Sequence, residues 1–292
     1  MKKIALALFA FAASAVSLLH AQTVTLKFNP ANGSRYDVIN TNTLRMKQTL
    51  MGQVMNMDFS TTANMRYELA DAGAEKVVVI SYGPVKTAIN FAGQELHIDS
   101  ESPDTANAAN KIFRSIRGKK VKAFIAADGT VKKMEGWEQL TGALGTDQES
   151  RAIAGELFSE ATIKSLLEQG FKMYPEKPVS AGSTWASVIR IEKPYKLTMH
   201  NQYTLKKIEG GKSLISIDGK VGTNGVTKME QQGMDVEVNL DGTVSGTISL
   251  DNATGITDTS NLVQQLKGTM KVQGMEVPME ATVETNIQMK QR

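Results

Sequence analysis

Few side chains in this 292-residue sequence stand in a pattern that performs chemistry. Outside the first 21 residues the histidines are His97 and His200. His97 lies between Leu96 and Ile98, and His200 follows Met199, each in an alternating segment. Alternation places both histidines on the polar side of a strand, away from the enclosed position that general acid–base catalysis requires. The sequence has no cysteine and no Gly-x-Ser-x-Gly motif. We therefore expect a protein that is not an enzyme and that has no catalytic residues and no cofactor.

Methionine is the unusual residue type, since five of the fifteen methionines fall between positions 46 and 65. The spacing of Met51, Met55 and Met57 predicts that they face the same side of a strand. Thioethers are ligands for Cu(I), but no cysteine or inward-facing histidine completes such a site, so we expect no metal. Flexible methionines also suit the lining of a cavity for a lipid or another apolar molecule, and an ordinary core needs the same residues.

Four copies of a short motif position these side chains. Each copy has a glycine followed by two apolar residues at strand spacing, Gly-x-x-Φ-x-Φ, where Φ is apolar. The copies begin at Gly52, Gly93, Gly233 and Gly274. Because residues two apart share one face of a strand, the motif predicts strands with one apolar face. The candidates for contact with an apolar ligand are Met51, Met55, Met57, Leu96, Ile98, Val236, Val238, Val277 and Met279.

Turn and helix signals complete the predicted architecture. Asp128-Gly129 and Asp241-Gly242 are each the residue pair that a type I′ hairpin turn prefers, which predicts a turn at both places. Helical spacing and start signals predict helices over 103–117 and 147–170, and Gly155 and Ser159 predict a bend or a break within the second. We expect a mainly β (α+β) fold: one or two strongly curved antiparallel sheets, half-barrel-like and possibly duplicated, with helices on the concave faces.

The first 21 residues predict export. Lys2 and Lys3 precede an apolar run and a small residue at position 21, the pattern of a signal peptide cleaved after Ala21. Residue 22 is Gln rather than the cysteine of a lipid anchor, so we expect a soluble periplasmic or secreted protein without an integral membrane span. The net charge of +3 falls to about +1 without the two lysines, which predicts no nucleic-acid binding.

The remaining chain divides at a segment rich in proline and glycine. We expect an N-terminal β-rich half over 22–174, a joint over 175–184 and a C-terminal antiparallel half over 185–292. Residues Pro175 to Trp185 resemble the Pro-x-x-Pro-Val-x-x-Gly-x-x-Trp joint of an uncharacterised family of secreted bacterial proteins, and the C-terminal half is similar to that of the family. The Asp251-x-x-Thr-Gly255 segment resembles a turn in periplasmic lipoprotein-carrier domains, which implies a curved half-barrel around helices.

These features predict a binding module for an apolar ligand such as a lipid or acyl chain. A structural or protein-interaction module of the cell envelope, with a filled core and a protein partner, is one alternative. An unrecognised hydrolase is another, since hydrolytic carboxylates need not be close in sequence.

Overall fold

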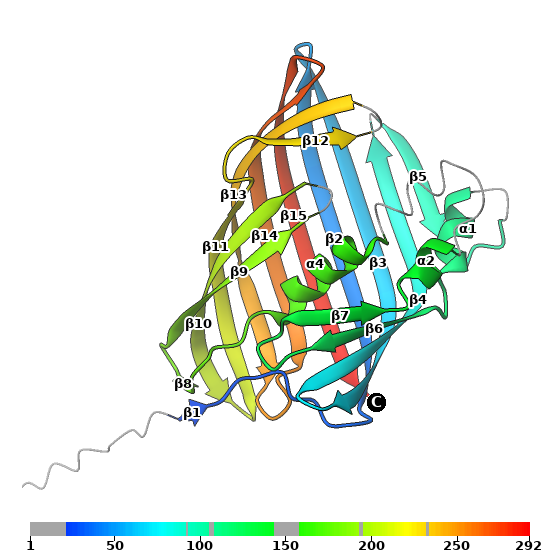
Figure 1. The fold of residues 1–292 in the computed structure, drawn as a ribbon. Coiled ribbons are helices and arrows are strands. Elements are labelled where there is room, and N and C mark those ends of the chain that lie inside the picture. Colours follow the sequence, from blue (N-terminus) through cyan, green and yellow to red (C-terminus); the bar gives the residue numbers. More distant parts are fainter. Residues whose placement is uncertain (1–21, 92, 105–107, 143–157, 193–194, 232–233) are drawn as a thin grey trace, which may run out of the picture.

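One antiparallel sheet dominates the computed structural model, which describes residues 22–91, 93–104, 108–142, 158–192, 195–231 and 234–292 (Figure 1). Within these residues the sheet has 13 strands, and the main path runs β7-β6-β4-β3-β2-β15-β14-β13-β11-β10-β9, with β5 beside β4 and β12 beside β13. The strands are β2 Arg35–Leu50, β3 Gln53–Ala72, β4 Glu75–Phe91, β5 Gln94–Asp99, β6 Lys120–Ile125, β7 Val131–Glu135, β9 Thr184–Ile191, β10 Leu197–Glu209, β11 Lys212–Gly222, β12 Thr227–Gln231, β13 Met234–Asp251, β14 Thr257–Val272 and β15 Met275–Gln291. Strands β1 (Thr23–Val24) and β8 (Val179–Ser180) form a separate pair.

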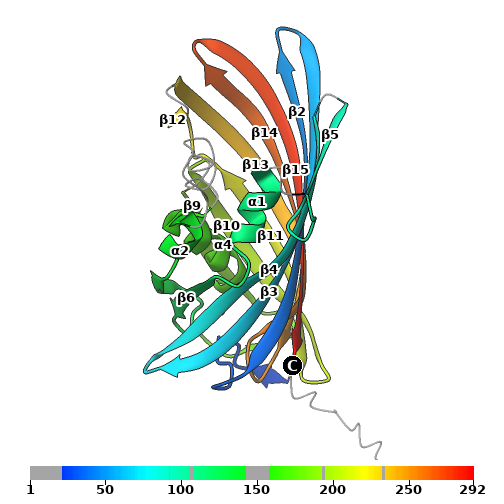
Figure 2. The ribbon, with the colours of Figure 1, turned by 90° about the vertical axis from the view of Figure 1, so that its right-hand side faces the viewer.

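The two halves of the chain share this sheet. Strand β2 pairs with β15 from Tyr36 opposite Gln291 to Gln48 opposite Met279, so strands from near the two ends of the chain lie side by side at the centre (Figure 1). The sheet is strongly curved and open (Figure 2). The predicted fold class, a curved antiparallel sheet with helices on its concave face, is confirmed.

A glycine inside β13 corrects one turn prediction. Asp128-Gly129 does form the turn between β6 and β7, and Gly129 has φ +83°. Asp241-Gly242, by contrast, lies within β13, and the prediction of a turn there is wrong. A Cβ atom at Gly242 would lie 2.0 Å from the backbone oxygen of Gln265 on β14. Glycine is therefore needed for the close approach of two backbones in a curved sheet, a role that the Asp-Gly pair does not distinguish from a turn.

Three helices in the described chain lie on the concave side of the sheet (Figures 1 and 2): α1 Ala108–Ser115, α2 Glu138–Gly142 and α4 Glu160–Phe171. Helix α1 falls within the predicted 103–117, but the described residues 103, 104, 116 and 117 are not helical. Ser102 accepts a hydrogen bond from the Asp104 amide (3.2 Å). Helix α4 begins after Ser159, whose Oγ accepts a hydrogen bond from the Thr162 amide (3.2 Å). Residues 147–157 of the predicted helix lie outside the described residues. Helix α2 was not predicted.

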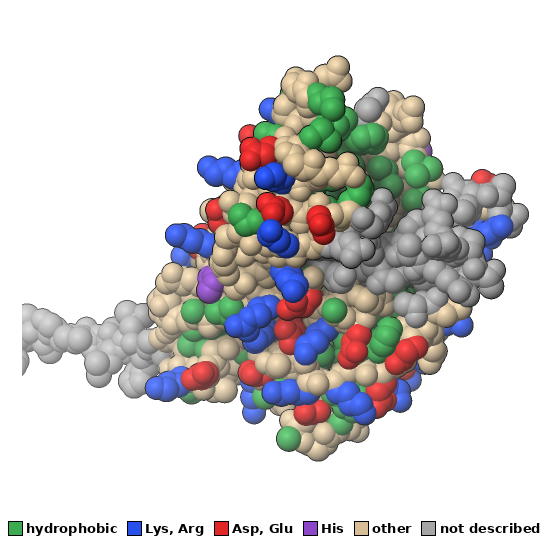
Figure 3. Space-filling model, turned by 45° about the horizontal axis from the view of Figure 1, so that its top comes forward, with side chains coloured by type: hydrophobic (Ala, Val, Ile, Leu, Met, Phe, Trp, Pro, Cys, Tyr) green, Lys and Arg blue, Asp and Glu red, His purple; other side chains and the backbone are tan. Residues whose placement is uncertain are grey.

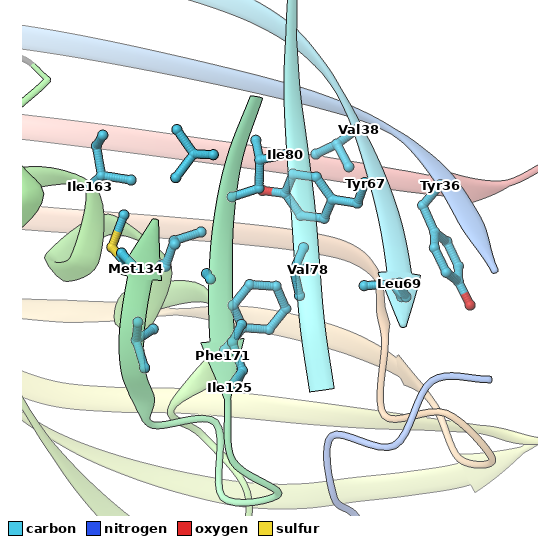
Figure 4. Close-up of a cluster of buried hydrophobic side chains, with 14 of the residues drawn as sticks. Tyr36, Val38, Tyr67, Leu69, Val78, Ile80, Ile125, Met134, Ile163 and Phe171 are labelled. Carbon is cyan, nitrogen blue, oxygen red and sulfur yellow. The ribbon is translucent and has the colours of Figure 1, made fainter. Parts of the chain in front are cut away.

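The helices cover a filled core over one end of the sheet. We call this the lower end, and the end with the β2–β3, β4–β5, β12–β13 and β14–β15 turns the upper end, as in Figure 1. Tyr67 and Ile80 of the sheet point toward Phe171 of α4 (Figure 4), and Phe171 packs edge-on against Phe28 with ring centroids 4.9 Å apart. None of the described helices has the length and apolarity needed to cross a bilayer.

Candidate ligand-binding surface

Near the upper end, apolar side chains from neighbouring strands line up across the concave face. The strand register places Leu44 opposite Phe59 and Phe59 opposite Ile89. Directly paired residues point to the same face of a sheet, so these side chains form one row, which Leu96 on β5 continues opposite Ile89. A second row, one step closer to the upper turns, consists of Met46, Met57 and Phe91.

These two rows and Met55 form what we call the upper concave surface. Its members are Leu44, Met46, Met55, Met57, Phe59, Ile89, Phe91 and Leu96. Phe91 is 41% exposed and Leu96 is 45% exposed, and the other six are half-buried. Core residues of a folded domain are far less exposed than this. The surface is therefore a contiguous apolar area, only partly covered, on the inner side of a curved sheet.

A small buried cluster borders the upper concave surface across β15. Val236, Val238 and Leu240 of β13 pack with Met279 of β15, and each is at most 4% exposed. The half-buried Met46 packs against this cluster and so joins it to the upper concave surface. The two areas together give the upper half of the concave face an apolar lining from β5 to β13.

A seam of polar side chains separates this lining from the core beneath. The Thr61 and Thr87 hydroxyls lie 2.8 Å apart, and the Thr285 hydroxyl donates to Asn42 Oδ1 at 2.8 Å. The Asn42 amide in turn donates to Asn40 Oδ1 at 3.0 Å. Thr61 pairs with Thr87 across β3 and β4, and Asn42 pairs with Thr285 across β2 and β15, so these partly buried polar groups have hydrogen-bond partners.

The upper half of the concave face has no ionisable side chain at the described strand positions between the seam and the upper turns. Charged side chains lie on the convex face instead. Arg45 contacts Glu284 across β2 and β15 (2.6 Å), and Lys228 contacts Glu237 across β12 and β13 (3.0 Å). The hydrogen bond from Lys228 holds the pKa of the Glu237 carboxyl below its usual range. The sheet thus has one neutral apolar face and one charged face.

The convex face carries a shallow hollow of about 710 Å³ behind β2, β15 and β14. Charges of both signs line it, among them Arg45, Asp58, Lys267 and Glu280. Because Glu280 lies opposite a lysine on each neighbouring strand, the charges compensate one another. The charges that line the hollow therefore do not favour a ligand of either charge.

The candidates predicted from the sequence fall into three places. Met55, Met57 and Leu96 lie on the upper concave surface, and Val236, Val238 and Met279 lie in the bordering cluster. Ile98 and Val277 point to the same face and are each 7% exposed. The prediction that Met51 shares this face is wrong, because β2 ends at Leu50 and Met51, with φ 51° and 82% exposure, lies in the turn.

Sequence reasoning missed five members of the upper concave surface: Leu44, Met46, Phe59, Ile89 and Phe91. A signal for them was present. Leu44 and Met46 are two residues apart, Phe59 continues the spacing of Met55 and Met57, and Ile89 and Phe91 alternate just before Gly93. Four of these residues lie on strands that precede a motif glycine, and Phe59 lies just beyond the two apolar positions of the motif that begins at Gly52.

Both histidines lie where their segments predict, exposed on the convex face. His97 Nε2 lies 3.5 Å from a Glu95 carboxylate oxygen, and both side chains are mostly exposed to water. Among the residues that the structure describes, no three His, Asp or Glu side chains gather closely enough to hold a metal ion.

Comparisons with known proteins show the fold and the family. One likeness is to a solved structure of lipovitellin, "Lipid-protein interactions in lipovitellin", with a TM-score of 0.50 and 10% identity. It covers 90% of this chain, which spans only 25% of the lipovitellin chain. The β domain of the Bordetella autotransporter BrkA (TM-score 0.26, 10% identity, 88% of this chain and 99% of that one) and an outer membrane channel from Pseudomonas putida F1 (TM-score 0.22, 5% identity, 89% and 96%) match at values too low to indicate a common fold.

No curated protein matches the chain in sequence. A family model does match, over residues 73–257, which is more than half of the chain. This match confirms the resemblance to an uncharacterised family. The chain belongs to the family of unknown function DUF6263.

Proposed function

We propose that this protein holds an apolar ligand, such as a lipid or acyl chain, on its upper concave surface and catalyses no reaction on it. One observation carries the proposal: apolar side chains from four adjacent strands form a contiguous, partly exposed and charge-free surface on the inside of a curved sheet. An apolar patch that stays in contact with water does not stabilise the fold. Exposed patches of this kind mark binding sites.

The energetics favour an extended hydrocarbon. Burial of one methylene contributes about 0.8 kcal/mol, so a chain of about ten methylenes gains about 8 kcal/mol before the cost of association. A charged head group would lose its hydration on this surface without meeting an opposite charge. The hydrocarbon therefore lies along the surface, and a charged head group stays at the upper end, in water.

The likeness to lipovitellin supports the same ligand class. That structure describes lipid–protein interactions in lipovitellin, and its likeness extends over 90% of this chain. The signal-peptide pattern of residues 1–21, which lie outside the described residues, supports a periplasmic or secreted location.

Titration of the purified protein with a fluorescent fatty acid, cis-parinaric acid, tests the proposal. Met57→Glu and Ile89→Glu each place a carboxylate on the upper concave surface and should weaken binding at least tenfold. Ile39→Glu is the matched control, because Ile39 is an exposed apolar residue (42%) on the convex face of β2. Absence of saturable binding to the wild-type protein, or equal weakening by the control, would contradict the proposal.

A protein-interaction role in the envelope is the second candidate, and the filled lower core favours it. Two large clusters of buried side chains occupy the lower concave face. A protein that binds no fatty acid but co-purifies with one envelope protein would support this role in place of ligand binding.

A further inference from the structure

Exposed apolar side chains gather at the upper turns. Met51 is 82% exposed, Val54 is 54% exposed and Met275 is 43% exposed, and all three lie in or beside the β2–β3 and β14–β15 turns. The space-filling view shows hydrophobic side chains at this end of the molecule, next to charged ones lower down (Figure 3). The upper concave surface begins directly below, since Met55 follows Val54 on β3.

The backbone of the β2–β3 turn makes the choice of methionine notable. Met51 (φ 51°) and Gly52 (φ 79°) both have positive φ, as in a type I′ turn. Asparagine, aspartate and glycine take this conformation most readily, and a long apolar side chain is disfavoured there. Met51 is 82% exposed, so packing does not require this side chain either. Folding gives no reason for this residue, which points to a functional one.

Charge is absent from the tip and balanced just below it. From Gln48 to Met55 the chain has no charged residue. A row of alternating sign crosses the convex face two residues below the β14–β15 turn: Lys228, Glu237, Lys271 and Glu276. At about 3.3 Å per residue the row lies about 7 Å below the turn, within the depth of about 5–10 Å to which apolar groups enter a bilayer interface. Its paired charges complement zwitterionic head groups, which carry one charge of each sign.

The lower end of the sheet differs. Arg35 contacts Glu68 (3.5 Å), and Asp37 lies between Arg66 (3.7 Å) and Arg292 (2.6 Å). These exposed ion pairs favour water over hydrocarbon. Of the two ends, only the upper one suits an apolar surface.

We propose that the upper turns dock on the surface of a lipid bilayer. Met51, Val54 and Met275 enter the interface, and the alternating charges remain among the head groups. Docking in this orientation opens the upper concave surface toward the lipids, so an acyl chain could pass onto it without crossing water. The inference goes beyond ligand binding, because it assigns a second surface and a second partner, the bilayer.

Co-sedimentation of the protein with phosphatidylcholine vesicles tests the inference. The double variant Met51→Asp/Met275→Asp should bind vesicles at least tenfold more weakly than the wild type. Ile39→Asp/Leu214→Asp is the matched control, since each of these convex residues is 42% exposed, and it should bind as the wild type does. Raising the salt concentration about tenfold should change binding less than about twofold, because the tip has no charge and the charges in the row below it compensate one another.

Two further variants keep the result interpretable. Met51→Asn favours the turn conformation and should weaken vesicle binding without lowering the melting temperature, whereas Met51→Leu should keep vesicle binding. Both should bind cis-parinaric acid as the wild type does, since Met51 lies outside the upper concave surface. Fatty-acid binding without vesicle binding would overturn docking and leave the proposed function standing, and vesicle binding without fatty-acid binding would do the reverse. Self-association that the double variant abolishes, with vesicle binding unchanged, would show that a second copy covers the turns and would also overturn docking.

Discussion

The upper and lower parts of the concave face have the same strands and the same alternation but different cover. In the lower part, Tyr67 and Ile80 are almost fully buried beneath α4 and the β6–β7 hairpin. In the upper part, Phe91 and Leu96 are 41% and 45% exposed on the same face of the same sheet. The difference shows that an apolar strand face alone does not make a core. What packs on it decides whether it stabilises the fold or remains free to bind.

Replacing one phenylalanine by alanine in each part should show the largest difference in stability between the lower and upper parts. Phe171→Ala removes a ring that is 4% exposed and packs against Phe28, so we expect a loss of about 3–5 kcal/mol in the free energy of unfolding. Phe59→Ala removes a half-buried ring of the upper concave surface and should cost about 1 kcal/mol. Urea denaturation measures both, and similar losses would show that the upper surface is also part of the core.

The next largest loss of stability should come from a substitution at a glycine where two strands of the curved sheet approach closely. Gly242→Ala places a Cβ atom 2.0 Å from the Gln265 oxygen and should cost about 3 kcal/mol, because β13 and β14 must move apart. Gly274→Ala is the control: nothing lies within 4 Å of its Cβ position, and only the φ of +85° opposes the substitution, at about 1 kcal/mol. Thermal unfolding of the two variants gives the order, and a reversed order would argue against a packing role for Gly242.

The polar seam should show a smaller effect that depends on pairing. Thr61→Val or Thr87→Val alone removes one of two hydroxyls that lie 2.8 Å apart and should cost about 1–2 kcal/mol. The double substitution should cost less than the sum, because neither hydroxyl is then left without its partner. A double-mutant cycle in urea measures the coupling, and strict additivity would mean that the two hydroxyls do not interact.

The smallest effect at neutral pH should come from Tyr67. Burial raises the pKa of the Tyr67 hydroxyl above its usual value of 10.0. A group whose pKa is raised on folding contributes stability below its unfolded pKa and loses it as pH rises, so stability should fall above about pH 10. Between about pH 10 and pH 11, the urea midpoint of the Tyr67→Phe variant should fall less steeply than that of the wild type. An equal fall in both would assign the alkaline loss to other groups.

Much of the upper face could be predicted from the sequence. In each Gly-x-x-Φ-x-Φ copy the apolar pair does point to the concave face, as Leu96 with Ile98 and Val236 with Val238 show. Three of the four initial glycines are described, and Gly52, Gly93 and Gly274 all have positive φ at the start of a strand. These features depend on neighbours in sequence only, which is why a pattern could predict them.

Other features depend on partners that are distant in the chain. No pattern predicted that Leu44 would lie between Phe59 and Val283, since β2 could in principle have paired with another strand. The Asp241-Gly242 pair predicts a turn, although the structure places it inside β13, because glycine serves both in hairpin turns and in close contacts between strands.

The sequence by itself determined which side chains share a face, because a strand alternates with a period of two residues whatever lies beside it. Only the tertiary structure decided which of those faces are covered. It paired β2 with β15 near the two ends of the chain, placed α4 over the lower rows and left the upper rows partly exposed. What packs on a strand face depends on contacts between residues far apart in the chain. The apolar alternation along a strand is the same whether that face is covered or exposed.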